Sequence, residues 1–272
     1  MSEIKVNSIK GVSASVAALS INNTDGTCTA NITNNLSNRR LNINGDMKVA
    51  QRPSAAISST AYGAVDRYQL EVGGLDEGVT VAQADVASDT TPYTLGFRKS
   101  LKLTNGNQSN GAGGTDTMRI LHKFEAQDIA QSGWNYKSAS SFITLSFWIK
   151  SSVAQSFKVA VISWDGTIMT FTFDTGSLTA DTWTKVTKTI PGNSNITIDN
   201  DNNLGFQISF FQYLGTTYTA SGYTEDAWAA FANPQTKDQT TTWYTTNNAT
   251  YELTGVQLEV GSVATDFEHR SF

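Results

Sequence analysis

The sequence predicts an all-β protein, an antiparallel β-sandwich of the jelly-roll type preceded by an extended N-terminal segment. Thr, Ser, Asn and Gly are abundant while Lys, Glu and Pro are sparse, which favours strands and turns over helices. Apolar side chains recur at every second position in several windows between Leu41 and Val260, and turn-rich stretches separate these windows. Antiparallel strands without helical crossovers are expected to close into two facing sheets.

The strand windows are expected in chain order along the second part of the sequence. In residues 142–150, Ile143 and Phe147 fall on the apolar face, whereas Trp148 falls on the polar face. His122 alternates with apolar residues and is therefore predicted at the edge of the core. The phase of the last window slips at Gly255, which predicts a β-bulge. The windows are residues 97–103, 117–124, 142–150, 168–174, 204–212 and 251–260.

Turn signals and two short helical patterns complete the expected framework. Asp165-Gly166 predicts a hairpin between strands near residues 157–164 and 167–174. Short helices are expected at residues 125–131 and 224–232, and Gly/Asn-rich loops at residues 104–115 and 192–203.

Residues 1–34 differ from the rest, and we predict them to be a separate attachment or oligomerisation segment, with residues 35–272 forming the sandwich domain. No large aromatic residue precedes Tyr62, so the segment cannot close a core by itself. It is expected to lie on a neighbouring chain or to thread through an oligomeric fibre, and a disordered tail is the alternative. Its spaced apolar residues are Ile4, Val6, Ile9, Val12, Val16, Leu19 and Ile21.

Composition disfavours several classes of protein. Only 16% of the residues are charged and the net charge is -5, which argues against a nucleic-acid binder. The N-terminal residues lack the basic start and apolar run of a signal peptide, so we expect synthesis in a cytosol and no membrane insertion. Cys28 is the single cysteine, so no internal disulfide is expected.

Four segments resemble a known family of phage proteins. Residues 41–52 (LNINGDMKVAQR) look like the opening of phage tail-fibre and virion structural domains, and Asp66-Arg67-Tyr68 resembles the step that follows. Residues 145–152 resemble the central strand, and residues 253–270 resemble the closing strand and tail. The family usually has proline where Asp266 stands, so the exit from the last strand is expected to differ. The segment order over residues 36–272 is also similar to carbohydrate-binding-module jelly rolls.

This resemblance implies a non-enzymatic virion component, assembled in the host cytoplasm. We expect a tail-fibre or appendage subunit that attaches to the host, with host surface glycan as a candidate partner. The N-terminal segment is expected to bind other phage virion proteins and to assemble the chain as a homo-oligomer, a trimer in the favoured reading. The alternative is a capsid decoration or cement protein; a glycan-active enzyme and a free carbohydrate-binding protein are further alternatives.

The insertion from Tyr213 to Tyr244 is the best candidate binding surface in the sequence. Flat aromatic faces can bind the apolar faces of sugar rings while Tyr hydroxyl and Trp N–H groups provide polar contacts. The alternative is that these side chains anchor the long loop on the sandwich or pack against another subunit. The candidate ligand-binding residues are Tyr213, Tyr218, Tyr223, Trp228, Trp243 and Tyr244.

Motifs for catalysis or cofactor binding do not stand out, and no catalytic residue is assigned. By resemblance, a structural calcium ion is a candidate at Asp46 and Glu259, since Ca²⁺ prefers carboxylate and carbonyl oxygens. Asp199 and Asp201 are the alternative, and simple turn formation is the other interpretation of these acidic residues.

Overall fold

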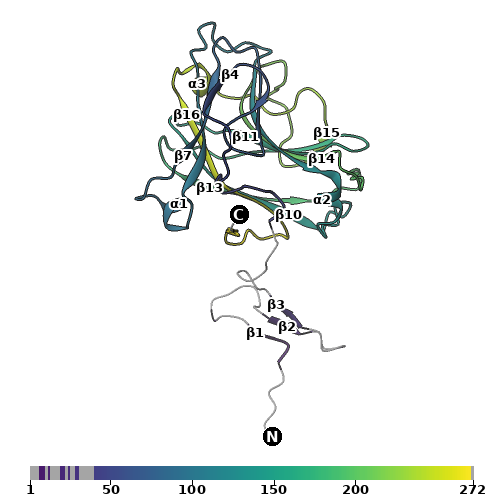
Figure 1. Ribbon diagram of the computed structural model, residues 1–272. Helices are drawn as coiled ribbons and strands as arrows, with labels where there is room; N and C mark the ends of the chain where they lie inside the picture. The colour runs from purple at the N-terminus through teal and green to yellow at the C-terminus, as the bar shows by residue number, and fades with distance from the viewer. Residues whose placement is uncertain are drawn as a thin grey trace. The chain divides into compact units, whose positions relative to one another are not determined.

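The computed structural model describes residues 6–9, 12, 19–21, 24, 28–30 and 40–270. The chain divides into two compact units, Met1–Arg39 and Arg40–Phe272. The second unit is a sandwich of two antiparallel sheets, which Figure 1 shows facing each other. This confirms the predicted fold class.

Each sheet takes strands from distant parts of the chain, because the chain repeatedly crosses from one sheet to the other. The six-stranded sheet has the order β13 (Thr184–Pro191), β10 (Phe142–Ser151), β16 (Thr250–Val260), β8 (Lys99–Thr104), β7 (Val79–Asp85) and β4 (Ala55–Ile57). The seven-stranded sheet has the order β15 (Trp228–Ala230), β12 (Met169–Asp174), β11 (Lys158–Ser163), β14 (Leu204–Leu214), β9 (Thr117–Glu125), β6 (Tyr68–Gly73) and β5 (Ala61–Tyr62). The helices are α1 (Thr91–Thr94), α2 (Ala126–Ala130) and α3 (Thr242–Thr245).

The core lies between the two sheets and is built from the apolar positions of the alternating windows. Phe147 of β10 meets Phe210 of β14 edge to face, with ring centroids 5.1 Å apart, and so links the two sheets. Phe157 and Tyr251 make a similar contact at 5.1 Å. Each fully buried side chain of this size contributes about 1.5–3 kcal/mol by leaving water.

The expected strands, hairpin and bulge are present. All six windows lie within or overlap strands, and β11 and β12 pair across the turn at Asp165-Gly166, where Gly166 has a φ of 62°. The pairing of β10 with β16 shifts register between Ser146 and Trp148, opposite Gly255, whose φ is 61°. His122 is 2% exposed, as expected for a residue on the core face.

The prediction of a helix at residues 224–232 was wrong. This segment instead contains β15, in which Trp228 pairs with Phe171 of β12 and their rings lie 5.7 Å apart. Pairing with an available sheet edge and burial of the indole outweigh the weak local helical preference. The helix expected at residues 125–131 is present as α2.

The N-terminal unit contains a small antiparallel sheet of β1 (Ser8–Ile9), β2 (Leu19–Ile21) and β3 (Cys28–Ala30). Val6, Ile9 and Val12 are exposed, whereas Leu19 and Ile21 are partly buried. Ile4 and Val16 lie outside the described residues. The attachment role of this segment stays a prediction.

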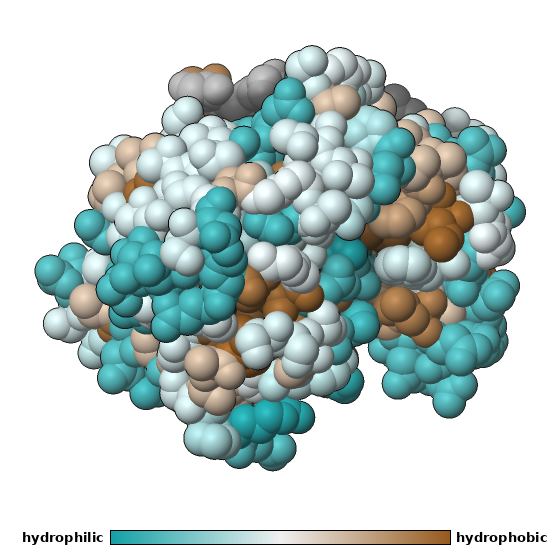
Figure 2. All heavy atoms as spheres, turned by 90° about the horizontal axis from the view of Figure 1, so that it is seen from above, coloured by the Kyte–Doolittle hydropathy of each residue, from teal (hydrophilic) through white to brown (hydrophobic). Residues whose placement is uncertain are grey.

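The end of the molecule seen in Figure 2 is covered mostly by hydrophilic and neutral residues, with apolar atoms in separate areas. Among the described helices, none combines the length and apolar character that a membrane crossing needs.

Candidate functional site

A pocket of about 220 Å³ lies on the outer face of the six-stranded sheet. Its floor is formed by Ser146 and Trp148, which belong to the polar face of β10. Lys185 of β13 is paired directly opposite Trp148, so its side chain stands beside the indole. Two adjacent strands therefore supply a half-exposed aromatic ring and an exposed cation.

The walls of the pocket come from two segments far apart in the sequence. Leu95 and Phe97 follow α1, and Leu95 keeps 50% of its surface exposed. Thr265, Asp266, Phe267 and His269 belong to the C-terminal tail. The ring centroids of Phe97 and Phe267 lie 4.9 Å apart, and His269 Nε2 is 2.9 Å from the carbonyl oxygen of Leu95. These contacts join the two walls.

Two buried side chains of β16 fix the C-terminal tail. Glu259 accepts hydrogen bonds from Thr265 N at 2.9 Å and Thr265 Oγ1 at 2.6 Å. Gln257 donates to Glu259 and to the carbonyl of Asp266, and it accepts from Glu268 N at 2.8 Å. The Thr265–Glu268 segment is thereby held at a defined position above the sheet.

The calcium ion predicted at Asp46 and Glu259 stays a prediction, and both side chains already have contacts within the protein. The oxygens of Glu259 are occupied by the tail, and the Asp46 carboxylate is fully buried with Lys48 Nζ 2.8 Å from Oδ2. Arg40 lies near the same carboxylate. Burial lowers the pKa of Arg40 and the charge of Asp46 opposes that shift, so the Arg40 cation also compensates the charge of Asp46. In the part of the chain that the structure describes, no group of three or more His, Cys, Asp or Glu residues could hold a metal ion.

The bulge at Gly255 allows the indole to lie close to the sheet. A Cβ atom at Gly255 would lie 2.7 Å from Phe97 Cζ and 3.1 Å from Trp148 Cδ1, closer than side chains tolerate. Its positive φ also favours glycine. Gly255 thus sets the depth of the pocket between Phe97 and Trp148.

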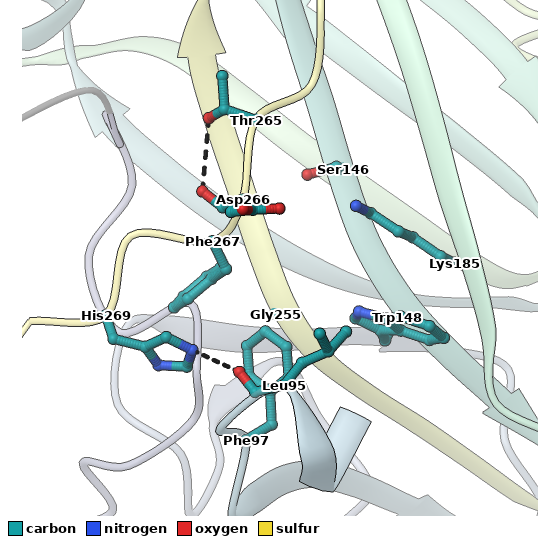
Figure 3. A pocket seen from close by; sticks show the side chains of 10 residues that line it. All are labelled: Leu95, Phe97, Ser146, Trp148, Lys185, Gly255, Thr265, Asp266, Phe267 and His269. Atoms are coloured by element: carbon teal, nitrogen blue, oxygen red, sulfur yellow. Dashed lines mark hydrogen bonds between the residues drawn. The ribbon is translucent and has the colours of Figure 1, made fainter. Parts of the chain in front are cut away.

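Figure 3 shows how polar and apolar groups divide the pocket. The Ser146 hydroxyl, the Lys185 ammonium group and Asp266 lie on one side, and Trp148, Leu95 and Phe97 lie on the other. A ligand that fits must present an apolar face to the rings and polar groups to the opposite side. A pocket of about 220 Å³ is smaller than pockets for drug-sized ligands, which measure roughly 300–1,000 Å³, and suits a single ring-sized group.

Three of the six aromatic residues predicted to bind ligand belong to the core instead. Tyr213 and Tyr244 stack with centroids 4.4 Å apart, and Trp243 is fully buried. Tyr244 donates a hydrogen bond to Asp116, and burial together with this carboxylate raises the pKa of its phenol. These three side chains cannot contact a ligand arriving from solvent, which corrects their assignment and agrees with the packing alternative.

The other three predicted residues lie in a segment that covers the outer face of the seven-stranded sheet. This cover segment (residues 215–241) places Tyr218 and Phe231 against a buried cluster that includes Ile162 and Phe211. Trp228 packs on the core and donates through Nε1 to the carbonyl of Pro191 at 2.7 Å. A ligand-binding role for Tyr218, Tyr223 and Trp228 stays a prediction.

Sequence reasoning missed Trp148, although a signal was present. In residues 142–150 the indole occupies the polar face, among Thr144, Ser146 and Lys150. An indole on the solvent side of an alternating strand was therefore the available signal for a surface pocket.

No protein-family model matches the sequence, and comparison with curated proteins gives no match either. Several solved structures are similar in fold. A candidate sugar binding protein from Bacteroides thetaiotaomicron is 10% identical with a TM-score of 0.43, over 82% of this chain and 100% of that chain. The family 11 carbohydrate-binding module of a cellulosomal cellulase from Clostridium thermocellum is 11% identical with a TM-score of 0.34, over 80% of this chain and 98% of that chain.

The enzymatically active domain of tailspike protein 4 from bacteriophage CBA120 is also similar, with 10% identity and a TM-score of 0.38. The match covers 72% of this chain and 20% of the tailspike chain. At TM-scores below 0.5, the sandwich assignment rests on the strand order of this chain itself.

Proposed function

We propose that this protein is a non-enzymatic, carbohydrate-binding subunit of a phage tail fibre or related virion appendage. The observation that carries the binding part of the proposal is the pocket that pairs the Trp148 indole with Ser146, Lys185 and Asp266. The sequence resemblance of residues 41–52 and 253–270 to phage tail-fibre proteins supports the virion part.

The chemistry of the pocket matches that of a sugar ring. A pyranose has C–H groups on its faces and hydroxyl groups around its edge, so it can stack on an indole while its hydroxyls form hydrogen bonds. The Lys185 ammonium group donates hydrogen bonds, and the Ser146 hydroxyl can donate and accept. Hydrogen bonds of the C-terminal tail with Gln257 also fix the side of the pocket that carries Asp266. Because this side is already ordered, ligand binding costs less conformational entropy.

Binding without turnover is the expected activity. Glycoside hydrolysis needs two carboxyl groups across the scissile bond, about 5–9.5 Å apart. Among the described residues that line the pocket, Asp266 is the single carboxylate. A ligand in the pocket would therefore contact one carboxylate, without the second carboxylate that hydrolysis needs.

In this proposal the N-terminal segment attaches the chain to the virion and assembles it as a trimer. The exposed Val6, Ile9 and Val12 would be covered by neighbouring chains. Repetition of one weak sugar site in a trimer would raise the avidity for a surface that carries many glycans.

Binding to a panel of neutral oligosaccharides, followed by calorimetry with the best ligand, tests the proposal. We expect Trp148→Ala to weaken binding at least tenfold, because the stacking surface is lost. Trp183→Ala is the matched control, since Trp183 lies beside Lys150, with Lys150 Nζ 5.1 Å from its ring centroid, and does not line the pocket.

Loss of binding in both tryptophan variants would point to a general effect on the sheet and count against the pocket. Unchanged binding in Trp148→Ala, or release of reducing sugar by the purified protein, would refute the proposal.

A further inference from the structure

A second groove lies at the edge of the seven-stranded sheet and shares no residue with the Trp148 pocket. Its largest part, about 450 Å³, is lined by Ile43, Asn44, Val49, Arg52, Tyr62, Asp66 and Arg67. Two smaller hollows adjoin it, and Arg67 lines all three. Arg67 is therefore the centre of one extended groove.

Arg67 is held in the groove at a conformational cost. Its φ is 74°, in the left-handed region that a side chain with a Cβ rarely adopts. The surrounding backbone fixes this conformation, because Asn44 Nδ2 donates to the carbonyl of the preceding residue, Asp66, at 3.0 Å and to Val49 at 2.9 Å. Such backbone conformations concentrate at functional sites.

The guanidinium group of Arg67 is exposed and, among the described residues, has no hydrogen-bond or ion-pair partner. The neighbouring Arg52 differs, because its Nη1 is 2.8 Å from Asp66 Oδ1. Arg67 thus keeps its full set of N–H donors for a ligand, in a protein whose net charge is -5.

The inner wall of the groove contains a buried histidine next to Arg67. His122 lines the hollow beneath Arg67, is 2% exposed, and has no hydrogen-bond partner at Nδ1. Burial and, to a smaller extent, the cations of Arg67 and Arg40 together lower the pKa of His122 to about 3, so the ring is neutral at pH 7. The two guanidinium cations that contribute to this shift, Arg67 and Arg40, would attract an anion.

The flanks of the groove are apolar and exposed. Tyr62 and Ile43 keep 43% and 45% of their surfaces exposed, and the Arg52 guanidinium carbon lies 5.7 Å from the Tyr62 ring centroid. At the far end Lys123 hydrogen-bonds to Gln69, and Glu125 accepts a bond from Gln127. The carboxylates of Asp66 and Glu125 thus have partners already, whereas Arg67 has none.

We propose that this groove binds a sugar that carries a carboxylate, with the carboxylate on the Arg67 guanidinium and the ring against Tyr62. Arginine suits this ligand because its planar fork matches a carboxylate in two parallel hydrogen bonds. This site goes beyond the proposed neutral-sugar pocket and does not depend on it. Together the two sites would let the protein recognise acidic polysaccharide.

Calorimetry with digalacturonic acid and its neutral counterpart digalactose tests the proposal. We expect the full-length protein to bind the acidic disaccharide at least tenfold more tightly than the neutral one. Arg67→Gln and Arg67→Gly should each remove this preference, and Arg67→Lys should restore part of it. The glycine variant accommodates a φ of 74° without strain, so its melting temperature should stay close to that of the wild type.

Lys137→Gln is the matched control, because it removes one exposed positive charge outside the groove. It should bind digalacturonic acid as the wild type does. Trp148→Ala should also keep this binding, which separates the present proposal from the proposed function. Equal affinity for the two disaccharides, no measurable binding of the acidic one, or retained preference in Arg67→Gly would overturn the proposal.

Discussion

Gly255 combines two constraints at one position, and each can be measured. Its φ of 61° disfavours any side chain, and a Cβ would lie 2.7 Å from Phe97 and 3.1 Å from Trp148. We expect Gly255→Ala to lower the free energy of unfolding by about 2–4 kcal/mol, from backbone strain and overpacking together. Urea denaturation followed by tryptophan fluorescence gives this value.

Gly111→Ala is the control for this substitution. Gly111 has a φ of 82° and open space where a Cβ would stand, so its replacement should cost only the backbone term, about 1–2 kcal/mol. Equal losses of unfolding free energy in the two variants would show that contact of the added Cβ with Phe97 and Trp148 does not destabilise the protein.

His122 makes the stability of the fold depend on pH. In the native state its ring is neutral, because burial lowers its pKa to about 3, with ring neighbours Tyr68 at 4.8 Å and Phe124 at 4.9 Å. In the unfolded state the ring takes up a proton near pH 6.5. The contribution of neutral His122 to the free energy of unfolding is therefore fully present above pH 6.5. It is lost as the pH drops towards 3, by up to about 1.4 kcal/mol per pH unit.

His122→Phe removes this titration and keeps an aromatic ring between its neighbours. Urea unfolding at pH 7 and pH 4.5 should show a smaller loss of stability for the variant than for the wild type. All other titratable residues are the same in the two proteins, so their contributions cancel in the comparison. If the free energy of unfolding fell equally with pH in the two proteins, His122 would not be the source of the pH dependence.

At single positions, alternation predicted burial well and function poorly. The period of two placed His122 on the core face and Trp148 on the outer face, and both positions are confirmed. The burial of Trp243 and Tyr244 could not be predicted, because it depends on contacts with Asn105, Asp116 and Gln155, far away in the sequence. Tertiary contacts of this kind leave no local pattern.

At the scale of elements, the cover segment (residues 215–241) is held to the seven-stranded sheet by a buried ion-pair group. Lys158 is 7% exposed and its Nζ lies 2.7 Å from both Asp174 and Glu225. Burial alone would lower the pKa of Lys158, but the hydrogen bonds with the two carboxylates outweigh it and raise the pKa. Lys158 is therefore charged, and both partners compensate that charge.

We expect Glu225→Gln to lower the free energy of unfolding by about 1–3 kcal/mol, since the buried ammonium group keeps only one of its carboxylates. The cover segment should also become more sensitive to limited proteolysis. Asp226→Asn is the control, because Asp226 is 59% exposed and pairs with Lys188 at the surface, where a pair is worth about 1 kcal/mol or less. Similar proteolysis of the two variants would argue against the role of Glu225.

The long central strands could be predicted from the sequence, whereas the short edge strands could not. Strong alternation identified the central strands β8, β9, β10, β12, β14 and β16, and the hairpin turn at Asp165-Gly166 identified β11; these strands form the middle of both sheets. The short edge strands β4, β5 and β15 were missed because two or three residues carry no period. The two candidate sites lie where tail, bulge and edge strand meet, and their geometry depends on the complete fold.

At the scale of the whole molecule, the sandwich unit contains its own core and its own tail contacts. Every pairing of β4 to β16 lies within residues 55–260, and Arg40 N donates to Glu268 Oε2 at 3.0 Å. We therefore expect this unit to fold without the N-terminal residues, and the predicted oligomer to need them.

A chain that lacks residues 1–34 tests this division. We expect its unfolding midpoint in urea to equal that of the sandwich unit in the full-length protein, because the strand pairings of this unit lie within residues 55–260. We also expect light scattering to show a trimer for the full-length chain and a monomer for the shortened chain, since the exposed Val6, Ile9 and Val12 would lose their role in assembly. Calorimetry with the sugar ligands should give unchanged affinity per site, while binding to a glycan-coated surface should weaken strongly through loss of avidity. A shortened chain that remains trimeric would place the oligomer contacts on the sandwich and refute the assembly role of residues 1–34.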